Sequence, residues 1–338
     1  ANRSRMSRSD AKLLVVNGNM MITTRLIHLP KFMQKGDVLV VNDSATIPAS
    51  FKGYLGNRPV ELRLATNLHL EFDRFEEWRA LIFNAGSSHL PTEKRGIPPI
   101  QVGDQIYFSR YLTAEVIDLE SDRIIKIRFC NTHSSPLIQQ LFRLGTPIQY
   151  AYLQDKLEVY DQQTIFAGTP ASVEPPSAAF QFTWKLVNSL KVKGVTVVPI
   201  THSAGISSTG SKEQDQRLPF EEKYRISKKT GAIINAALEE GRRVITLGTT
   251  VIRAVESAAN NGKVEAGTAF TTLKIDRDFK PQIVSGILTG MHIPDESHMQ
   301  IIEAFSCRVE EAYQMAKLDD FLWHEYGDMG FFIRDSWQ

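Results

Sequence analysis

The sequence has few cysteines, no long apolar run and almost no net charge. Its two cysteines, Cys130 and Cys307, are too few for a disulfide framework, which predicts a reducing compartment such as the cytoplasm. No apolar run is long enough to cross a membrane, so no membrane partner is expected. The basic N-terminal residues 1–10 lack the apolar core of a signal peptide, and we expect a loose tail there.

The charges of the chain nearly cancel. With 39 Lys and Arg against 38 Asp and Glu, the net charge of +1 gives no global field that would indicate a nucleic-acid partner, although a local patch remains open. The three histidines His69, His89 and His133 lie far apart and lack metal-ligand spacing, so no metal site is predicted. A chain of 338 residues with 42% hydrophobic residues is long enough for two domains with a substantial core.

The most informative stretch runs from residue 242 to residue 257, with the sequence RRVITLGTTVIRAVES. Its apolar β-branched start predicts a buried strand, and the spacing after Thr250 predicts a helix. Between them, Gly248, Thr249 and Thr250 offer backbone and hydroxyl donors to a carboxylate, a phosphate or a ribose. Alternatively, Thr250 caps the helix and Arg253 forms a solvated ion pair with Glu256, one helical turn away.

Polar residues also mark the ends of other predicted strands. One strand ends at His202, another ends near Thr289 and His292, and the last is preceded by Tyr326 and Asp328. Because the carboxyl ends of parallel strands share one edge of a sheet, we expect these residues to meet there. Each retains a plain alternative: the histidines could be core residues bonded to carbonyl groups, and Asp328 could be a turn residue.

An earlier apolar run, residues 38–41, leads into Asn42 and Asp43. These two residues either bind a ligand or close a turn.

The pattern of apolar and polar residues changes between residues 55 and 149. Short alternating segments separated by Gly, Pro and Asn predict a small antiparallel β-barrel. Around it, helices are predicted at residues 136–144, 184–193, 227–240 and 295–318, and an ordered loop that shapes a pocket at residues 147–183. We therefore predict a discontinuous α/β main domain with the active site, residues 1–54 and 150–338, and an inserted barrel domain, residues 55–149.

Eight segments, in order and at similar spacing, resemble the S-adenosylmethionine:tRNA ribosyltransferase-isomerase family of queuosine biosynthesis. The resemblance covers nearly the whole chain, and its elements are specific in combination. The segments are GDVLVVNDSATIPA, VYDQQTIFA, PPSAAFQFT, PITHSAGISS, EEKYRIS, GTTVIRAVES, LTGMHIPDESHMQIIEAF and YGDMGFFI.

The resemblance implies a barrel-like α/β main domain with an inserted small antiparallel β-barrel. It also implies that S-adenosylmethionine is a substrate and that no metal is needed. In the family reaction a base removes a proton from the ribose carbon beside the sulfonium, which makes that C–H acidic. Adenine leaves, a 7-aminomethyl-7-deazaguanine base in tRNA attacks, and methionine departs as an epoxycyclopentane forms.

The matching motifs imply roles for particular residues. The expected catalytic residues are His202, Glu222 and His292; Glu222 sits beside Glu221 in a predicted loop, where it could instead be surface charge. The expected substrate-binding residues lie in the same motifs and are Asn42, Asp43, Gln163, Thr164, Gln181, Thr183, Gly248, Thr249, Thr250, Arg253, Glu256, Thr289, Tyr326 and Asp328.

The chain departs from the family pattern at polar positions. Gln181 stands where the family has a histidine, Arg217 and Phe220 stand in the segment that usually carries two histidines, and Ala45 and Ser50 replace arginines. Histidines suit proton transfer and arginines suit a tRNA backbone. Three hypotheses follow: an orthodox tRNA-modifying enzyme, a paralogue that uses S-adenosylmethionine with a small-molecule acceptor, and a non-catalytic binding protein.

Overall fold

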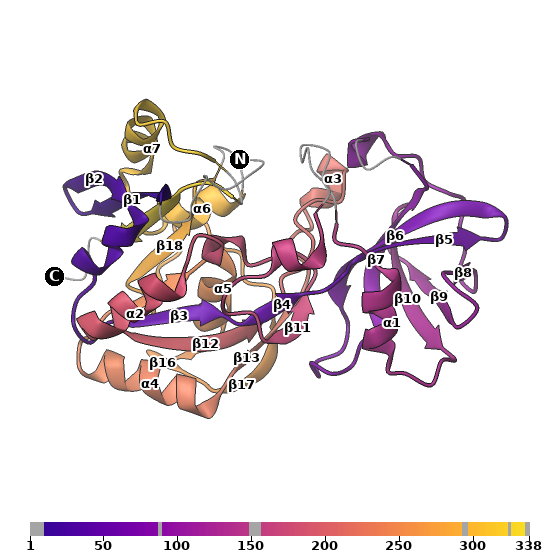
Figure 1. Ribbon diagram of the computed structural model, residues 1–338, viewed down its shortest axis with the longest axis horizontal. Helices are drawn as coiled ribbons and strands as arrows, with labels where there is room; N and C mark the ends of the chain where they lie inside the picture. Colours follow the sequence, from indigo (N-terminus) through magenta and orange to yellow (C-terminus); the bar gives the residue numbers. More distant parts are fainter. Residues whose placement is uncertain (1–9, 87–89, 149–156, 293–296, 324–325, 335–338) are drawn as a thin grey trace.

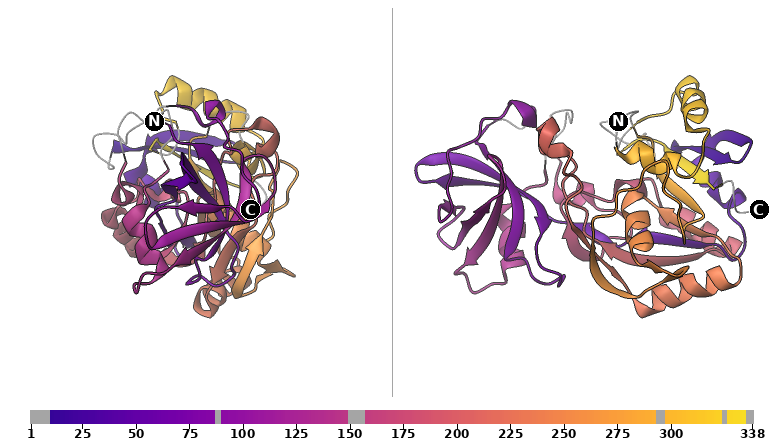
Figure 2. Two further views of the ribbon diagram at one scale, coloured as in Figure 1. Left: turned by 90° about the vertical axis from the view of Figure 1, so that its right-hand side faces the viewer. Right: turned by 180° about the vertical axis from the view of Figure 1, so that it is seen from behind.

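The computed structural model describes residues 10–86, 90–148, 157–292, 297–323 and 326–334. Two bodies lie side by side, a larger mixed α/β part and a smaller β-barrel, and the chain passes from one to the other along β4 (Ser44–Thr46) and β5 (Ser50–Leu55) (Figures 1 and 2). β4 pairs with β11 (Thr169–Ser172) beside this crossing. The expected α/β fold with an inserted antiparallel barrel is confirmed.

A nine-stranded mixed sheet forms the centre of the main domain, in the order β17-β13-β12-β3-β14-β18-β19-β1-β2. β3, β12, β14 and β18 are mutually parallel neighbours, whereas β19 runs antiparallel to β18. This sheet is open, with β17 and β2 as its edge strands, and the closed barrel is the inserted domain. The strands are β1 (Lys12–Asn17), β2 (Met20–Arg25), β3 (Val38–Asn42), β12 (Thr196–His202), β13 (Glu222–Ile226), β14 (Val244–Leu247), β17 (Gly267–Thr271), β18 (Gly286–Gly290) and β19 (Met329–Ile333).

Both faces of this sheet are covered because its central strands are apolar on both sides. On β3, Val38 and Val40 pack into one core and Leu39 and Val41 into the other. The first core contains residues of α4 (Lys228–Glu239), α5 (Thr249–Ser257), α6 (Ser297–Glu303) and α7 (Val309–Leu318). The second contains residues of the 3-10 helix η2 (Leu26–Lys31) and of α2 (Trp184–Lys193).

The inserted domain is a closed antiparallel barrel in the order β10-β7-β6-β5-β8-β9. Its apolar residues fill a separate core around Trp78, Phe51 and Phe83, and the middle of β7 is buried on both of its faces. Its further elements are β6 (Arg58–Asn67), β7 (Glu77–Asn84), η3 (Thr92–Lys94), β8 (Gln105–Tyr107), β9 (Leu112–Leu119), β10 (Ile124–Asn131) and α1 (Leu137–Leu144). The barrel thus begins at Ser50; the predicted boundary near residue 150 lies outside the described residues.

Two sequence expectations are wrong in detail. The predicted single helix 295–318 is two helices, α6 and α7, separated by residues 304–308. Glu222 lies at the start of strand β13 and not in a loop. The remaining short elements are η4 (Val159–Gln162), η5 (Ser177–Ala179), α3 (Lys212–Asp215), β15 (Ala259–Asn260) and β16 (Lys263–Val264).

Candidate active site

The predicted polar strand ends share one edge of the main sheet. β12, β14 and β18 all end there because they run in the same direction as β3. β19 begins there because it is antiparallel to β18, so the residues before it, Tyr326 to Asp328, reach the edge from the opposite direction. The mixed topology therefore gathers His202, Gly248, Thr289 and Asp328 along one edge.

A buried cluster of His202, Glu222 and Arg253 lies at this edge. His202 Nε2 is 3.5 Å from Glu222 Oε2, and Arg253 Nη1 donates to the same oxygen. Glu222 Oε1 accepts the backbone N–H of Gly205 at 2.6 Å, and Arg253 Nε donates to the carbonyl oxygen of Leu273 at 2.8 Å. β12, β13 and α5 thus bring together three side chains that are far apart in sequence.

The electrostatics of the cluster keep His202 neutral and Glu222 charged. Burial, opposed by Glu222 and assisted by Arg253, lowers the pKa of His202 to about 4. Burial alone would raise the pKa of Glu222, but Arg253, His202 and the Gly205 N–H hold it below the ordinary value. Within the described part of the chain, both ring nitrogens of His202 and Arg253 Nη2 are buried and have no hydrogen-bond partner. Such atoms are costly to bury and call for a ligand or water.

Asn42 and Asp43 form hydrogen bonds to the end of β12, at His202 and Thr201 respectively. Asn42 holds the backbone of His202 from both sides, since its Nδ2 donates to the carbonyl oxygen and its Oδ1 accepts the N–H, each at 2.9 Å. Asp43 accepts the Thr201 hydroxyl at 2.6 Å, and burial raises the pKa of its carboxyl group. Because successive strand residues point to opposite faces, Thr201 and Asp43 lie behind the His202 cluster.

The turn at Gly248 has the predicted strand–turn–helix form. Gly248 has φ of +98°, a value that favours glycine, and a Cβ there would lie 3.3 Å from Ala178 Cβ. Gly248 itself precedes the first helical residue and no side chain caps α5, so the alternative of a Thr250 cap is wrong. Thr249 is buried and Thr250 half-buried beside this turn.

The alternative of an Arg253–Glu256 ion pair is also wrong. Glu256 accepts the backbone N–H groups of Gln282, Ile283 and Val284 at 2.8, 3.1 and 2.8 Å. Burial raises its pKa, and these three donors act against that rise. Its carboxylate therefore ties α5 to the segment before β18, and its predicted role in substrate binding remains a prediction.

His292 lies beside β18 and the last helices. Its Nε2 is 2.9 Å from the Thr289 hydroxyl, and its backbone N–H donates to the hydroxyl oxygen of Tyr313 at 3.2 Å. Its ring stacks on His298, with centroids 5.0 Å apart. The structure thus joins two predicted residues, Thr289 and His292, in one hydrogen bond.

Gln181 holds the segment before β19. Its amide Nε2 donates to the carbonyl oxygens of Tyr326 and Gly327 at 2.9 and 3.0 Å. Next to it, the rings of Phe180 and Tyr326 stack with centroids 4.9 Å apart. Asp328 accepts the backbone N–H groups of Lys12 and Leu322 at 2.7 and 2.8 Å, so its carboxylate also has a structural use.

The remaining predicted binding residues organise the loop before α2. Gln163 bonds to the backbone of Thr46 in both directions, at 3.1 and 2.9 Å. The Thr164 hydroxyl accepts the Phe166 N–H at 3.2 Å, and the Thr183 hydroxyl caps α2 by accepting the Leu186 N–H at 3.2 Å.

The departures Arg217 and Phe220 lie at the contact with the barrel. Phe220 is buried, and the guanidinium carbons of Arg79 and Arg217 lie 4.5 and 5.8 Å from its ring centre. Arg217 donates to Glu120 of the barrel at 2.7 Å. Ala45 lies in β4, and the Ser50 hydroxyl donates to Glu61 at 3.1 Å. The substituted positions therefore join or brace the two domains.

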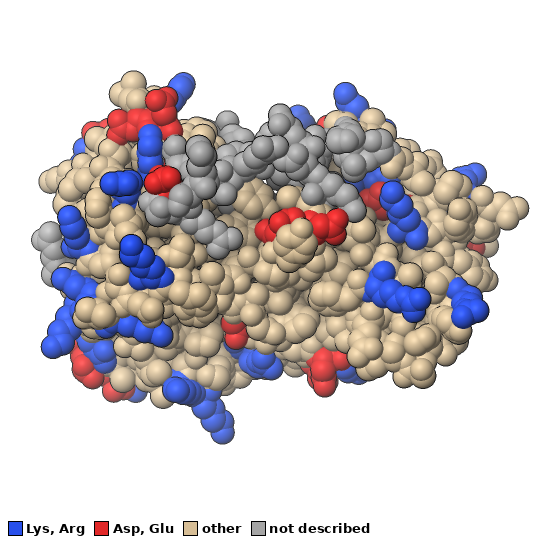
Figure 3. Space-filling model, viewed as in Figure 1, with Lys and Arg blue, Asp and Glu red and all other residues tan. Residues whose placement is uncertain are grey.

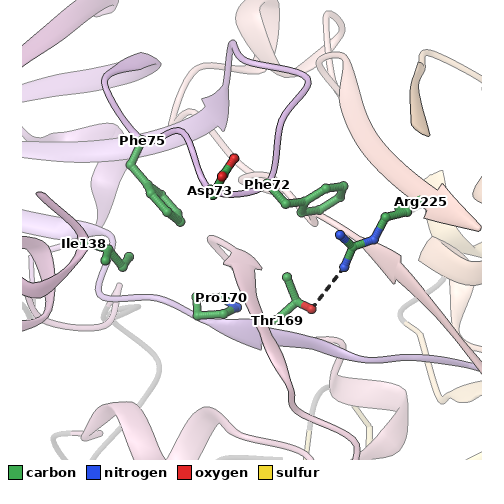
Figure 4. A pocket seen from close by; sticks show the side chains of 7 residues that line it. All are labelled: Phe72, Asp73, Phe75, Ile138, Thr169, Pro170 and Arg225. Atoms are coloured by element: carbon green, nitrogen blue, oxygen red, sulfur yellow. Dashed lines mark hydrogen bonds between the residues drawn. The ribbon is translucent and has the colours of Figure 1, made fainter. Parts of the chain in front are cut away.

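A pocket lies between the domains, behind the His202 cluster. Thr169 and Pro170 come from the loop predicted to shape a pocket, whereas sequence reasoning missed Arg225 and the barrel residues that line it. The pocket holds about 450 Å³, and two of its lining residues are joined because Arg225 donates to the Thr169 hydroxyl at 3.4 Å (Figure 4). The alternation of residues 222–226 was the available signal, because it places Arg225 on the face opposite Glu222. The lining residues are Phe72, Asp73, Phe75, Ile138, Thr169, Pro170 and Arg225.

The residues that the structure describes contain no group of three or more His, Cys, Asp or Glu side chains placed to hold a metal ion. None of the helices formed by these residues has the length and apolar character needed to cross a membrane.

The two-domain fold and the buried polar cluster at the sheet edge define an α/β enzyme with an inserted barrel. The family model described as queuosine biosynthesis protein matches residues 1–332, and the chain belongs to this family. Relatives of the chain are named as transferase-isomerases, and it is an enzyme of this class. Among solved structures, it resembles an S-adenosylmethionine tRNA ribosyltransferase from Thermotoga maritima with a TM-score of 0.53 and 21% identity, covering 98% of this chain and 95% of the other, a likeness of fold alone.

Three curated relatives are named S-adenosylmethionine:tRNA ribosyltransferase-isomerase. The relative from Carboxydothermus hydrogenoformans is 30% identical over 95% of this chain and 92% of its own length. Those from Fusobacterium nucleatum and Erythrobacter litoralis are also 30% identical, over 97% and 99% of this chain and 92% and 95% of their own lengths. The resemblance inferred from the motifs is confirmed.

Proposed function

We propose that this enzyme transfers the ribosyl part of S-adenosylmethionine to a 7-aminomethyl-7-deazaguanine base in tRNA, with loss of adenine and methionine. Family membership and the names of the relatives support this reaction class. The observation that carries it for this chain is the buried His202 ring, whose two nitrogens have no hydrogen-bond partner among the described residues. A neutral, unpartnered imidazole is suited to accept a proton.

In this proposal His202 is the base and Glu222 stabilises the charge that forms on it. With a pKa of about 4, His202 is neutral near pH 7 and can take the acidic proton beside the sulfonium. The resulting imidazolium would face Glu222 Oε2, 3.5 Å from Nε2. Arg253 keeps Glu222 ionised and oriented, so that Glu222 acts through His202 and is not itself the base.

Gln181 has a different role from the histidine that the family carries at this position. An amide group cannot accept a proton at neutral pH, and both donors of its NH2 group are used by the carbonyl oxygens of Tyr326 and Gly327. We therefore assign Gln181 to positioning the Tyr326 segment and leave proton transfer to His202.

The decisive experiment measures products with and without the acceptor. The protein is incubated with S-adenosylmethionine, with or without tRNA that contains the aminomethyl-deazaguanine base, and adenine, methionine and modified tRNA are followed by mass spectrometry. We expect all three products only when tRNA is present. Adenine or methionine release without tRNA would favour a small-molecule acceptor, and no turnover under any condition would contradict the proposal.

Variants separate the roles of the two residues. His202→Gln should lower kcat by roughly 10²–10⁴-fold, with KM for S-adenosylmethionine within a few fold of wild type, because general base catalysis contributes about this much. His133→Gln, a barrel histidine outside the cluster, is the matched control and should retain full activity. A His202→Gln enzyme with wild-type kcat would remove His202 from the chemistry.

A further inference from the structure

Two adjoining segments of the main domain carry lysines and no acidic residues of their own. Segments 26–36 and 184–196 contain Lys31, Lys35, Lys185, Lys191 and Lys193 but neither Asp nor Glu. All five lysines are exposed, and the two segments are neighbours because η2 packs against α2. We call these five lysines together with Trp184 the α2 basic surface; basic side chains gather over this end of the main domain (Figure 3).

The lysines of this surface are not neutralised locally. Among the described residues, none of the five lies within 4.0 Å of a carboxylate, whereas Lys126 and Lys263 form ion pairs elsewhere. The whole chain has a net charge of only +1, so five unpaired cations in two adjoining segments are a strong local excess.

Helix stability explains only part of this pattern. Lys191 and Lys193 lie in the last turn of α2, where a cation interacts favourably with the helix dipole. Lys185 lies in the first turn, where the dipole opposes a cation. Trp184 is 58% exposed at the same end, although burial of an indole ring is strongly favourable. Exposed aromatic and cationic side chains on one surface are typical of proteins that bind single-stranded RNA.

We propose that the α2 basic surface binds the phosphate backbone of the RNA substrate and that Trp184 stacks on an unpaired base. This inference rests on the proposed function. α2 precedes β12 and begins at the edge that carries His202, because Trp184 follows the edge residues Gln181 and Thr183 directly. The helix then leads about 15 Å away from the site, as expected for ten residues. The surface thus extends the site along the nucleic acid.

The α2 basic surface lacks the exposed apolar face that membrane binding requires. A helix that binds a bilayer inserts its apolar face, but Leu186, Val187 and Leu190 of α2 are already buried in the protein core. The residues of α2 that remain exposed are three lysines, the polar Asn188, and Trp184 and Val192 as the apolar groups.

The test compares two triple variants of the full chain. Lys185→Gln, Lys191→Gln and Lys193→Gln remove three charges from the surface, and Lys52→Gln, Lys228→Gln and Lys229→Gln remove three exposed charges elsewhere. Binding to aminomethyl-deazaguanine tRNA is measured by fluorescence anisotropy between about 50 and 200 mM salt. We expect the first variant to bind roughly 10–100-fold more weakly at low salt and its log–log salt slope to fall by about 2, because each phosphate contact contributes about 0.7–0.9 to that slope.

The control variant should change affinity less than about threefold, and both variants should keep wild-type affinity for S-adenosylmethionine. Trp184→Phe should abolish part of the tryptophan quenching that tRNA causes, which reports stacking directly. Wild-type tRNA affinity in the first variant, or an equal loss in the control, would overturn this inference alone. A wild-type protein that does not bind tRNA would overturn the proposed function as well, and tighter binding to vesicles of phosphatidylcholine and phosphatidylglycerol than to tRNA would assign the surface to lipid.

Discussion

At the residue scale, the low pKa of His202 leads to a prediction about stability that is independent of catalysis. Its pKa of about 4 in the folded protein lies below the ordinary value of 6.5. As pH falls from about 6.5 to 4, the unfolded chain binds a proton that the folded protein does not, so the folded state loses stability. The loss is roughly 3 kcal/mol over this window, since one pKa unit corresponds to about 1.4 kcal/mol.

Urea unfolding of wild type and His202→Gln at several pH values checks this expectation. The difference between their free energies of unfolding should be constant above about pH 7 and should shift against wild type between pH 6.5 and 4. Other titrating groups largely cancel in the difference. Parallel curves through this window would show that His202 titrates normally in the folded protein.

The buried ion pair between Glu222 and Arg253 leads to a second prediction about stability. Glu222→Gln leaves the buried guanidinium of Arg253 without its counter-charge, which should cost about 3–5 kcal/mol of stability and also lower turnover. The adjacent Glu221→Gln is the matched control, because the Glu221 side chain is 53% exposed and its pair with Arg79 should contribute less than about 1 kcal/mol. Equal melting temperatures for the two variants would contradict the importance of the buried pair.

At the element scale, Glu256 joins α5 to the segment before β18. In Glu256→Gln the amide oxygen can still accept the N–H groups of Ile283 and Val284, but the NH2 group would face the N–H of Gln282. One buried donor loses its acceptor, and we expect a loss of about 1–3 kcal/mol in the free energy of unfolding. KM for S-adenosylmethionine should stay within twofold of wild type; a large rise in KM with unchanged stability would instead support the substrate-binding role predicted from the sequence.

The elements that the sequence predicted well are those with strong local signals. α2 and α4 agree with their predicted bounds to within a residue, because each has a hydroxyl cap, Thr183 or Ser227, before an amphipathic run. β14 and α5 likewise follow from an apolar run and Gly248. The prediction of one long helix over residues 295–318 failed because residues 304–308 contain no proline or glycine to mark the break between α6 and α7.

The candidate site was less accessible to sequence reasoning because its contacts are non-local. Helical spacing predicts that Arg253 pairs with Glu256. In the structure Arg253 instead donates to Glu222, which is more distant in sequence. Glu222 reaches this position because β13 pairs with both β12 and β17. A charged five-residue strand such as β13 has no strong apolar signature. Residue identities at the strand ends could therefore be predicted, whereas their pairing could not.

At the scale of the whole molecule, Glu120 joins side chains of the barrel to the main domain. Its carboxylate lies 2.9 Å from Arg79 and 3.5 Å from Lys126 of the barrel, and 2.7 Å from Arg217 of the main domain. Its side chain is only 10% exposed, so solvent screens these pairs weakly. Phe220 packs against Arg79 and Arg217 in the same contact.

Glu120→Gln should loosen this contact without disrupting either domain core. We expect a loss of about 2–4 kcal/mol, because Arg79 would keep only its weaker pair with Glu221. Faster amide hydrogen exchange should be confined to residues 208–221 and the barrel strands that face them, since the ion pairs of Glu120 are with Arg79, Lys126 and Arg217. Glu77→Gln, which breaks a surface pair with Arg128 on the same barrel, is the matched control and should alter neither stability nor exchange measurably. If exchange instead rose uniformly across both domains, the two would unfold as one cooperative unit, and Glu120 would stabilise the whole molecule and not the contact alone.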